Sequence, residues 1–283
     1  MKRSLLFPYD SGFTPWMASR MDRRFSLSLY VPESMPYKGE SRLLLLVHGT
    51  SRVDWMRRCF QEFSERTGTV LMAPLFPVGA SDERDVHGYK WIHTHGVRYD
   101  LLLLDMIDQA ASTWNFAKDK FSLFGFSGGG QFANRFLYLH PKRLSALSIC
   151  APGNVTLPDP ELPWPAGVKG LKELFGISFD SKAVHAVPTH MAIGDADTET
   201  WEIAKSPDDP VYISRVNDLH TNRIVRLQRL RDELRNRGSA TLLEFVEGVA
   251  HEGPDLAPAV IRWMENNAVE RTSVSVGRNH RYD

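Results

Sequence analysis

The amino-acid sequence predicts an α/β protein with a mostly parallel central sheet flanked by helices. Short apolar runs alternate with helical stretches, as in a parallel sheet whose strands are joined by helices. One run, residues 121–126, passes into a glycine-rich segment and then into apolar residues at helical spacing. The 283 residues suffice for one full core, and α/β proteins of this size commonly form one domain. We therefore expect a single domain over residues 1–268.

The expected strands are short runs of aliphatic and aromatic residues, as strands buried on both faces of a sheet require. They lie at residues 25–31, 43–48, 69–74, 121–126, 144–151, 189–193 and 241–246. The intervening helical stretches make a parallel sheet the expected arrangement.

Three of these intervening segments have a helical pattern, at residues 53–66, 100–114 and 221–237. We expect Asp100 to be the N-cap of the second helix, because its carboxylate could accept the free amide hydrogens of the first turn. The third helix carries one apolar stripe among many charges, and Gly238 follows it as a stop signal. That stripe predicts packing against the core.

Two segments depart from the alternation. Residues 152–187 are rich in proline and glycine and lie between two expected strands, at the carboxyl edge of the sheet where ligands bind. This small insertion could form a lid over the site or be an ordinary surface excursion. Residues 269–283 are polar and show no period, so we expect a mobile C-terminal tail.

The balance of charge bears on the expected partners and location. Lys and Arg together number 34, as do Asp and Glu, so no net field would draw the protein to nucleic acid or to an anionic membrane. Cys59 and Cys150 alone do not predict a disulfide framework. The apolar stretch before Pro8 is too short for a signal peptide or a membrane span. We expect a cytoplasmic protein whose partners are small molecules.

The motif that carries chemistry is Gly125-Phe126-Ser127-Gly128-Gly129, between an expected buried strand and an expected helix. This order is typical of a nucleophile elbow, a sharp turn that holds a serine in a strained conformation with its hydroxyl exposed. Gly125 and Gly129 lack the side chains that would collide in such a turn. The motif predicts Ser127 as a nucleophile.

A serine hydroxyl needs a base to take its proton and an acid to orient that base. In this kind of fold the acid and then the histidine follow the serine, each in a loop just after a strand. Asp195 and Asp197 lie in the loop after residues 189–193, and we favour Asp197 because it has room to turn back across the sheet edge, whereas Asp195 could cap the turn. His251 follows the last expected strand and is the predicted base.

Negative charge that develops on the substrate needs hydrogen-bond donors. The backbone amide of Gly128 lies at the start of the expected nucleophile helix, where the helix dipole also favours negative charge. The second predicted donor is the amide of Thr50, in the segment His48-Gly49-Thr50 after an early strand. We expect His48 to be a structural residue that holds this loop in place.

Other side chains compete for a role. His93 and His95 could present imidazoles to a metal, but no complementary cysteine or carboxylate lies at short spacing, so no metal or other cofactor is predicted. Arg52 could hold a substrate carboxylate, although most arginines are solvated. Trp55 and Trp91 could line a pocket or fill the core, as could Trp114.

Over residues 25–266 the chain resembles the α/β-hydrolases, nearest to the serine esterases that are similar to polyhydroxybutyrate depolymerases, feruloyl esterases and dienelactone hydrolases. The resemblance rests on the serine motif, on His48-Gly49-Thr50, on Gly194-Asp195-Ala196-Asp197 and on Val249-Ala250-His251, in family order. It implies a serine esterase with Ser127, Asp197 and His251 as the triad. The secreted depolymerases of this group usually carry a signal peptide, which puts extracellular polymer degradation in doubt for this chain.

Several activities share this set of residues. The same triad could cleave an amide or a thioester, or transfer the acyl group to an alcohol. A ligand-binding protein on the same scaffold, or a lyase that uses the base directly on its substrate, are the alternatives from other classes.

Overall fold

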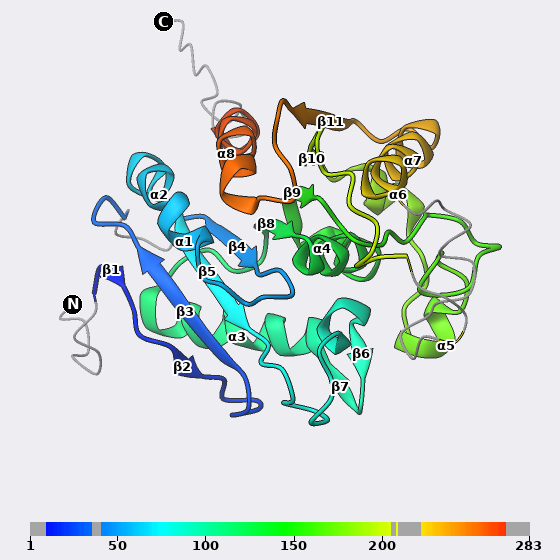
Figure 1. The fold of residues 1–283 in the computed structure, drawn as a ribbon. Helices are drawn as coiled ribbons and strands as arrows, with labels where there is room; N and C mark the ends of the chain where they lie inside the picture. Colours follow the sequence, from blue (N-terminus) through cyan, green and yellow to red (C-terminus); the bar gives the residue numbers. More distant parts are fainter. Residues whose placement is uncertain (1–9, 36–40, 205–207, 209–221, 270–283) are drawn as a thin grey trace, which may run out of the picture.

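The computed structural model describes residues 10–35, 41–204, 208 and 222–269. Among these residues, nine strands form one central sheet, in the order β1-β3-β5-β4-β8-β9-β10-β11, with β2 also paired to β3 (Figure 1). The strands are β1 (Gly12–Phe13), β2 (Met17–Ala18), β3 (Ser26–Val31), β4 (Leu43–Val47), β5 (Val70–Leu75), β8 (Phe121–Phe126), β9 (Leu144–Cys150), β10 (Thr189–Gly194) and β11 (Thr241–Val246). From β5 to β11 every neighbouring pair is parallel, whereas β3 and the short β1 and β2 add an antiparallel edge.

The helices are α1 (Met56–Cys59), α2 (Gln61–Thr67), α3 (Tyr99–Trp114), α4 (Gly128–Leu139), α5 (Leu171–Phe175), α6 (Ser181–His185), α7 (Arg223–Asn236) and α8 (Gly253–Val269). Helices α1, α2 and α8 lie on one side of the sheet and α3 and α4 on the other (Figure 1). Helix α4 packs on β8 and β9, and α7 packs on β10 and β11. Two 3₁₀ turns, at Gly88–Trp91 and Pro141–Arg143, and the hairpin of β6 (His93–Thr94) and β7 (Val97–Arg98) complete the described elements.

The core lies between the sheet and these helices, because the central strands are apolar along their whole length. Every residue of β4 is buried, and nearly every residue of β8 and β9. The seven strands expected from the sequence are all present, with bounds that differ by at most one residue at either end. The predicted fold class is confirmed.

The predicted helices need two corrections. Residues 53–66 form two short helices instead of one, because the chain breaks at Phe60, whose ring is buried against Phe124 at a centroid distance of 5.3 Å. Asp100 is not an N-cap: α3 begins at Tyr99, and the Asp100 carboxylate instead accepts hydrogen bonds from Arg98 and contacts His140 Nε2 at 2.7 Å. Helix α7 is capped by Asn222, which accepts from the amides of Ile224 and Val225.

Residues 152–187, expected as a small insertion, pack onto the domain. Asn134 and Tyr138 of α4 hydrogen-bond the backbone of Thr156, and Arg135 Nε donates to its hydroxyl at 3.0 Å. The expected C-terminal tail begins inside α8, which continues to Val269, and residues 270–283 lie outside the described residues. In the part of the chain that the structure describes, no helix is both long enough and apolar enough to cross a bilayer.

Candidate active site

Ser127 lies in a tight turn between β8 and α4. Its backbone has a φ of 55°, in the left-handed region that only glycine adopts freely, and its amide donates to Cys150 O at 2.9 Å. A Cβ atom on Gly125 would overlap the carbonyl of Gly129, and one on Gly129 would overlap the carbonyl of Val47. The two glycines of the motif are therefore required for the turn to pass between β8 and the neighbouring strand.

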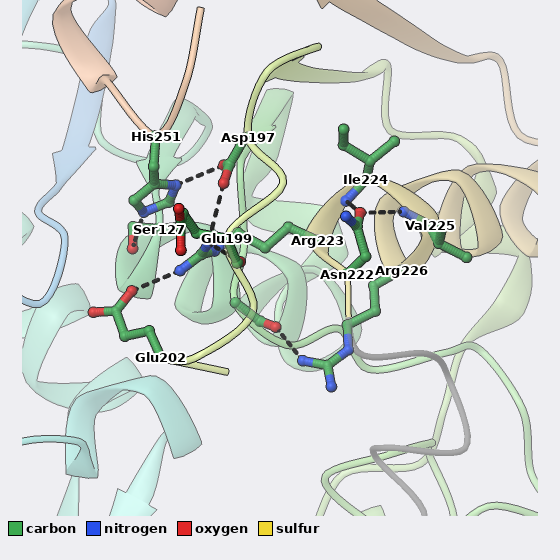
Figure 2. Close-up of polar contacts among 11 residues, drawn as sticks. Ser127, Asp197, Glu199, Glu202, Asn222, Arg223, Ile224, Val225, Arg226 and His251 are labelled. Carbon is green, nitrogen blue, oxygen red and sulfur yellow. Dashed lines mark hydrogen bonds and ion pairs between the residues drawn. The ribbon is translucent and has the colours of Figure 1, made fainter. Parts of the chain in front are cut away.

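The structure brings Ser127, His251 and Asp197 together at the carboxyl ends of β8, β11 and β10 (Figure 2). His251 Nε2 lies 3.0 Å from Ser127 Oγ, and His251 Nδ1 lies 2.7 Å from Asp197 Oδ2. The side chain of Asp197 has no exposed surface, whereas that of His251 is 24% exposed. A buried carboxylate, an imidazole and a serine hydroxyl thus form one continuous line of hydrogen bonds.

The two candidate acids have different contacts. Asp195 turns away from His251, and its Oδ1 accepts a hydrogen bond from the amide of Gly248 at 2.8 Å. That bond joins the loop after β10 to the loop after β11. Of the two aspartates, only Asp197 contacts His251 among the hydrogen bonds of the described residues.

Arg223, in the first turn of α7, is a site residue that the sequence did not indicate. Its Nη1 donates to Asp197 Oδ1 and to Glu199 O, both at 3.0 Å, and its Nη2 donates to Glu202 Oε2 at 2.6 Å (Figure 2). The Arg223 side chain is only 2% exposed. In the sequence it is one charge among many in an amphipathic helix, so no local signal distinguishes it from a solvated arginine.

His48 holds the loop that carries Thr50. Its Nε2 accepts a hydrogen bond from the amide of Phe76 at 3.1 Å, so Nδ1 is the protonated nitrogen and donates to Gly49 O at 2.9 Å. Burial lowers the pKa of His48 to about 4, which keeps the ring neutral. These contacts agree with a structural histidine.

Arg52 is bound by backbone carbonyls. All three guanidinium nitrogens donate to backbone carbonyls: Nε to Phe76 O at 3.0 Å, Nη2 to Val86 O at 2.7 Å and Nη1 to Thr50 O. The side chain therefore ties the loop containing Thr50 to two other segments. The sequence left open a substrate-carboxylate site or a solvated arginine, and it did not indicate this internal role.

Two cavities meet at Ser127 and Thr50. The described lining of the first includes Lys90, Trp91 and Gln131, and its volume is about 60 Å³. The second, of about 380 Å³, is lined by the apolar side chains Trp55 and Phe126 and also by His251. Trp55 and Trp91 thus line the cavities, whereas Trp114 is buried in the core.

Both predicted amide donors lie at this junction. Gly128 is the first residue of α4, directly after Ser127, and Thr50 lines both cavities. Among the residues that the structure describes, no group of three or more His, Cys, Asp or Glu side chains could hold a metal ion. His93 belongs to the β6–β7 hairpin and contacts the ring of Phe175.

No family model matches this chain, and no curated protein does. Solved structures do. The chain is similar to poly(aspartic acid) hydrolase-1 from Sphingomonas sp. KT-1, with 18% identity, a TM-score of 0.72, and 89% of this chain and 98% of that one covered. A poly(3-hydroxybutyrate) depolymerase from Bordetella parapertussis matches at 20% identity and a TM-score of 0.67, covering 86% of each chain. A fluorophosphonate-binding serine hydrolase from Staphylococcus aureus matches at 14% identity and a TM-score of 0.59, covering 90% and 98%.

Proposed function

The chain has the α/β-hydrolase fold that its motifs predicted, and we propose that it is a serine hydrolase that cleaves a small carboxylic ester. The observation that carries the proposal is the line of contacts Ser127 Oγ, His251 and Asp197, at 3.0 and 2.7 Å. These distances are within hydrogen-bond reach, as a nucleophile, its base and an orienting acid require.

Each side chain has a step in the proposed reaction. Ser127 Oγ attacks the acyl carbon while His251 Nε2 takes its proton, and Asp197 holds Nδ1–H and stabilises the imidazolium that forms. The amides of Thr50 and Gly128 donate to the oxygen that becomes negative. Removal of one such donor typically costs about a hundredfold to a thousandfold in kcat.

The tetrahedral intermediate collapses when His251 gives its proton to the leaving alcohol. The acyl group then remains on Ser127 as an ester, and a water molecule, deprotonated by His251, attacks it and releases the acid. Both half-reactions use the same base and the same oxyanion donors. The proposed reaction uses no cofactor.

The alternatives differ in substrate and share these residues. An amidase, a thioesterase or an acyltransferase would use the same triad, and a binding protein would hold ligand at the same junction without turnover. An ester, an amide and a thioester each have an acyl group and a leaving group that could occupy the two cavities beside Ser127. We propose the ester as the substrate because several of the similar solved structures are esterases.

The experiment measures hydrolysis of p-nitrophenyl esters of increasing chain length and of matched anilides, together with labelling by a fluorophosphonate probe. The wild type should take up the probe and cleave esters, and Ser127→Ala should do neither while melting at the same temperature. Ser112→Ala, at an exposed serine on α3, is the matched control and should behave as the wild type. Turnover of esters by Ser127→Ala at the wild-type rate would remove Ser127 as the nucleophile, and cleavage of anilides in preference to esters would favour the amidase.

A further inference from the structure

The two cavities beside Ser127 differ in their relation to the general acid, and this step rests on the proposed function. His251 must give its proton to the leaving group, so the leaving alcohol lies on the side of Ser127 that His251 lines. His251 is part of the described lining of the larger cavity and not of the smaller one. The acyl group of the substrate therefore occupies the smaller cavity.

The smaller cavity has room for few atoms. Its volume is about 60 Å³. A cavity of roughly 150 Å³ accommodates a benzene ring, so the smaller cavity holds about two or three non-hydrogen atoms beyond the acyl carbon. The acyl group is therefore short.

Gln131 lies one helical turn after the nucleophile and is part of the described lining of the smaller cavity. Its backbone amide donates to Ser127 O at 3.1 Å, and residues four apart share one face of a helix. Only 7% of Gln131 is exposed. A Cβ on Gly153 would lie 3.1 Å from Gln131 Nε2, so the amide end of the side chain packs against the backbone of Gly153, which lines the same cavity.

The side-chain amide of Gln131 is unpaired. Among the hydrogen bonds of the described residues, none involves this amide. Arg223, which also lines the smaller cavity, has a buried Nε with no hydrogen-bond partner in the described structure, although its other nitrogens donate to Asp197 and Glu202. A buried polar group without a partner costs free energy, which a substrate group that hydrogen-bonds it recovers.

The wall against which the Gln131 amide packs is held from behind. Arg226 of α7 donates from Nη1 to Gly153 O at 2.5 Å and also to Asn154 Oδ1. A Cβ on Gly153 would come within 3.0 Å of Ile203 Cγ2, so the space beside Gln131 depends on a glycine at this position. This wall is set before substrate binds, which lowers the entropic cost of binding a polar group there.

We propose that the acyl half of the substrate is a short 2-hydroxy acid whose hydroxyl hydrogen-bonds the side-chain amide of Gln131. A hydroxyl both donates and accepts, as the amide does. In the smallest such acid, glycolic acid, the acyl carbon carries one methylene and the hydroxyl, which matches the room in the smaller cavity. Attack by Ser127 releases the alcohol, which takes the proton from His251, and water then releases the hydroxy acid. The hydroxyl bound to Gln131 undergoes no chemistry.

The test compares two esters of benzyl alcohol that differ in one group. Benzyl glycolate carries a hydroxyl where benzyl propionate carries a methyl group, and the two acyl groups have nearly the same shape. Release of benzyl alcohol gives kcat/KM for each ester. Each value is divided by the rate constant of the same ester with hydroxide, because the hydroxyl also activates the acyl carbon. After this correction the wild type should prefer the glycolate at least about fivefold.

Gln131→Met keeps the length of the side chain and removes the amide. It should lower kcat/KM for the glycolate at least about fivefold and change that for the propionate less than about twofold, because only the glycolate loses a hydrogen bond. Gln228→Met, on α7 and outside the described lining of both cavities, is the matched control and should change neither value. Melting temperatures show which variants are folded.

Chain length tests the assignment of the acyl group to the smaller cavity. In the series of p-nitrophenyl esters, kcat/KM should fall beyond the butyrate, whose alkyl chain already fills that cavity. A wild type that cleaves the octanoate as fast as the propionate would place the acyl group in the larger cavity and overturn the proposal.

The remaining outcomes are equally distinct. A wild type with no corrected preference for the glycolate overturns the bound hydroxyl but leaves the esterase intact, and this result needs no variant. A preference that persists in folded Gln131→Met would mean that another group binds the hydroxyl. Equal losses for both esters in Gln131→Met, with an unchanged melting temperature, would assign Gln131 to the geometry of the nucleophile turn instead. If the wild type cleaves neither these esters nor the p-nitrophenyl esters, the proposed function itself fails.

Discussion

Asp197 shares its carboxylate between two side chains: Oδ2 lies 2.7 Å from His251 Nδ1, and Oδ1 accepts from Arg223 Nη1 at 3.0 Å. The arginine also reaches Glu202, which borders both cavities beside Ser127. Asp197 and Arg223 are almost completely buried, so water screens their interaction little. Arg223 therefore helps to hold the Asp197 carboxylate in position beside His251.

Replacing Arg223 by methionine should make this effect visible. Without Arg223 the Asp197 carboxylate loses one of the two side chains that hold it, so kcat for a neutral ester should fall. Loss of one partner of a buried ion pair should also lower the free energy of unfolding by about 3 kcal/mol. Arg223→Lys restores the charge and should recover part of the lost kcat. A destabilised Arg223→Met with an unchanged kcat would leave Arg223 with a structural role only.

The two aspartates of the loop after β10 allow a matched comparison. Asp197→Asn should lower kcat by about a thousandfold to ten-thousandfold, because an amide cannot hold His251 in the tautomer that accepts the proton of serine. Asp195→Asn should lose less than about tenfold in kcat, since among the hydrogen bonds of the described residues its carboxylate bonds only the amide of Gly248. Steady-state kinetics of both variants on one ester give the comparison, and similar losses for both would contradict the assignment of Asp197.

The strands could be predicted closely from the sequence, whereas the helix ends and the full site could not. Strands such as β8 are buried on both faces and read as continuous apolar runs with sharp ends. The start of α3 was misplaced because the role of Asp100 depends on His140, which comes from a distant part of the chain. A local capping signal cannot show such a partner.

The same distinction applies to the site. Ser127, Asp197 and His251 follow strands of the sheet, so their order along the chain is enough to place them at one edge. Arg223 and Lys90 come from a helix and a 3₁₀ turn, and only tertiary packing directs them toward Ser127. Residues of this second kind can be identified only once the fold is known.

His48 makes stability depend on pH. Burial lowers its pKa from 6.5 to about 4, so between these values the unfolded chain binds a proton that the folded protein excludes. The stability that this residue contributes is complete above pH 6.5 and is lost as the pH falls toward 4, by about 2 kcal/mol at pH 5. Urea unfolding at pH 7 and at pH 5 measures how far the free energy of unfolding falls between these two pH values. This fall should be about 2 kcal/mol smaller in His48→Gln than in the wild type. Equal losses in the two proteins would mean that His48 is protonated in the folded state.

Arg52 gives a prediction that separates a structural arginine from a substrate-binding one. Because its guanidinium bonds three carbonyls, one of them that of Thr50, Arg52→Met should loosen the loop that carries the proposed oxyanion amide. The expected loss is at least about tenfold in kcat, with little change in KM, for an ester of any charge. The measurement compares kcat and KM of the wild type and Arg52→Met for two p-nitrophenyl esters, one neutral and one whose acyl group ends in a carboxylate. If Arg52→Met weakened only cleavage of the ester with the carboxylate, Arg52 would be a carboxylate site, and the internal role deduced from its three carbonyl contacts would be wrong.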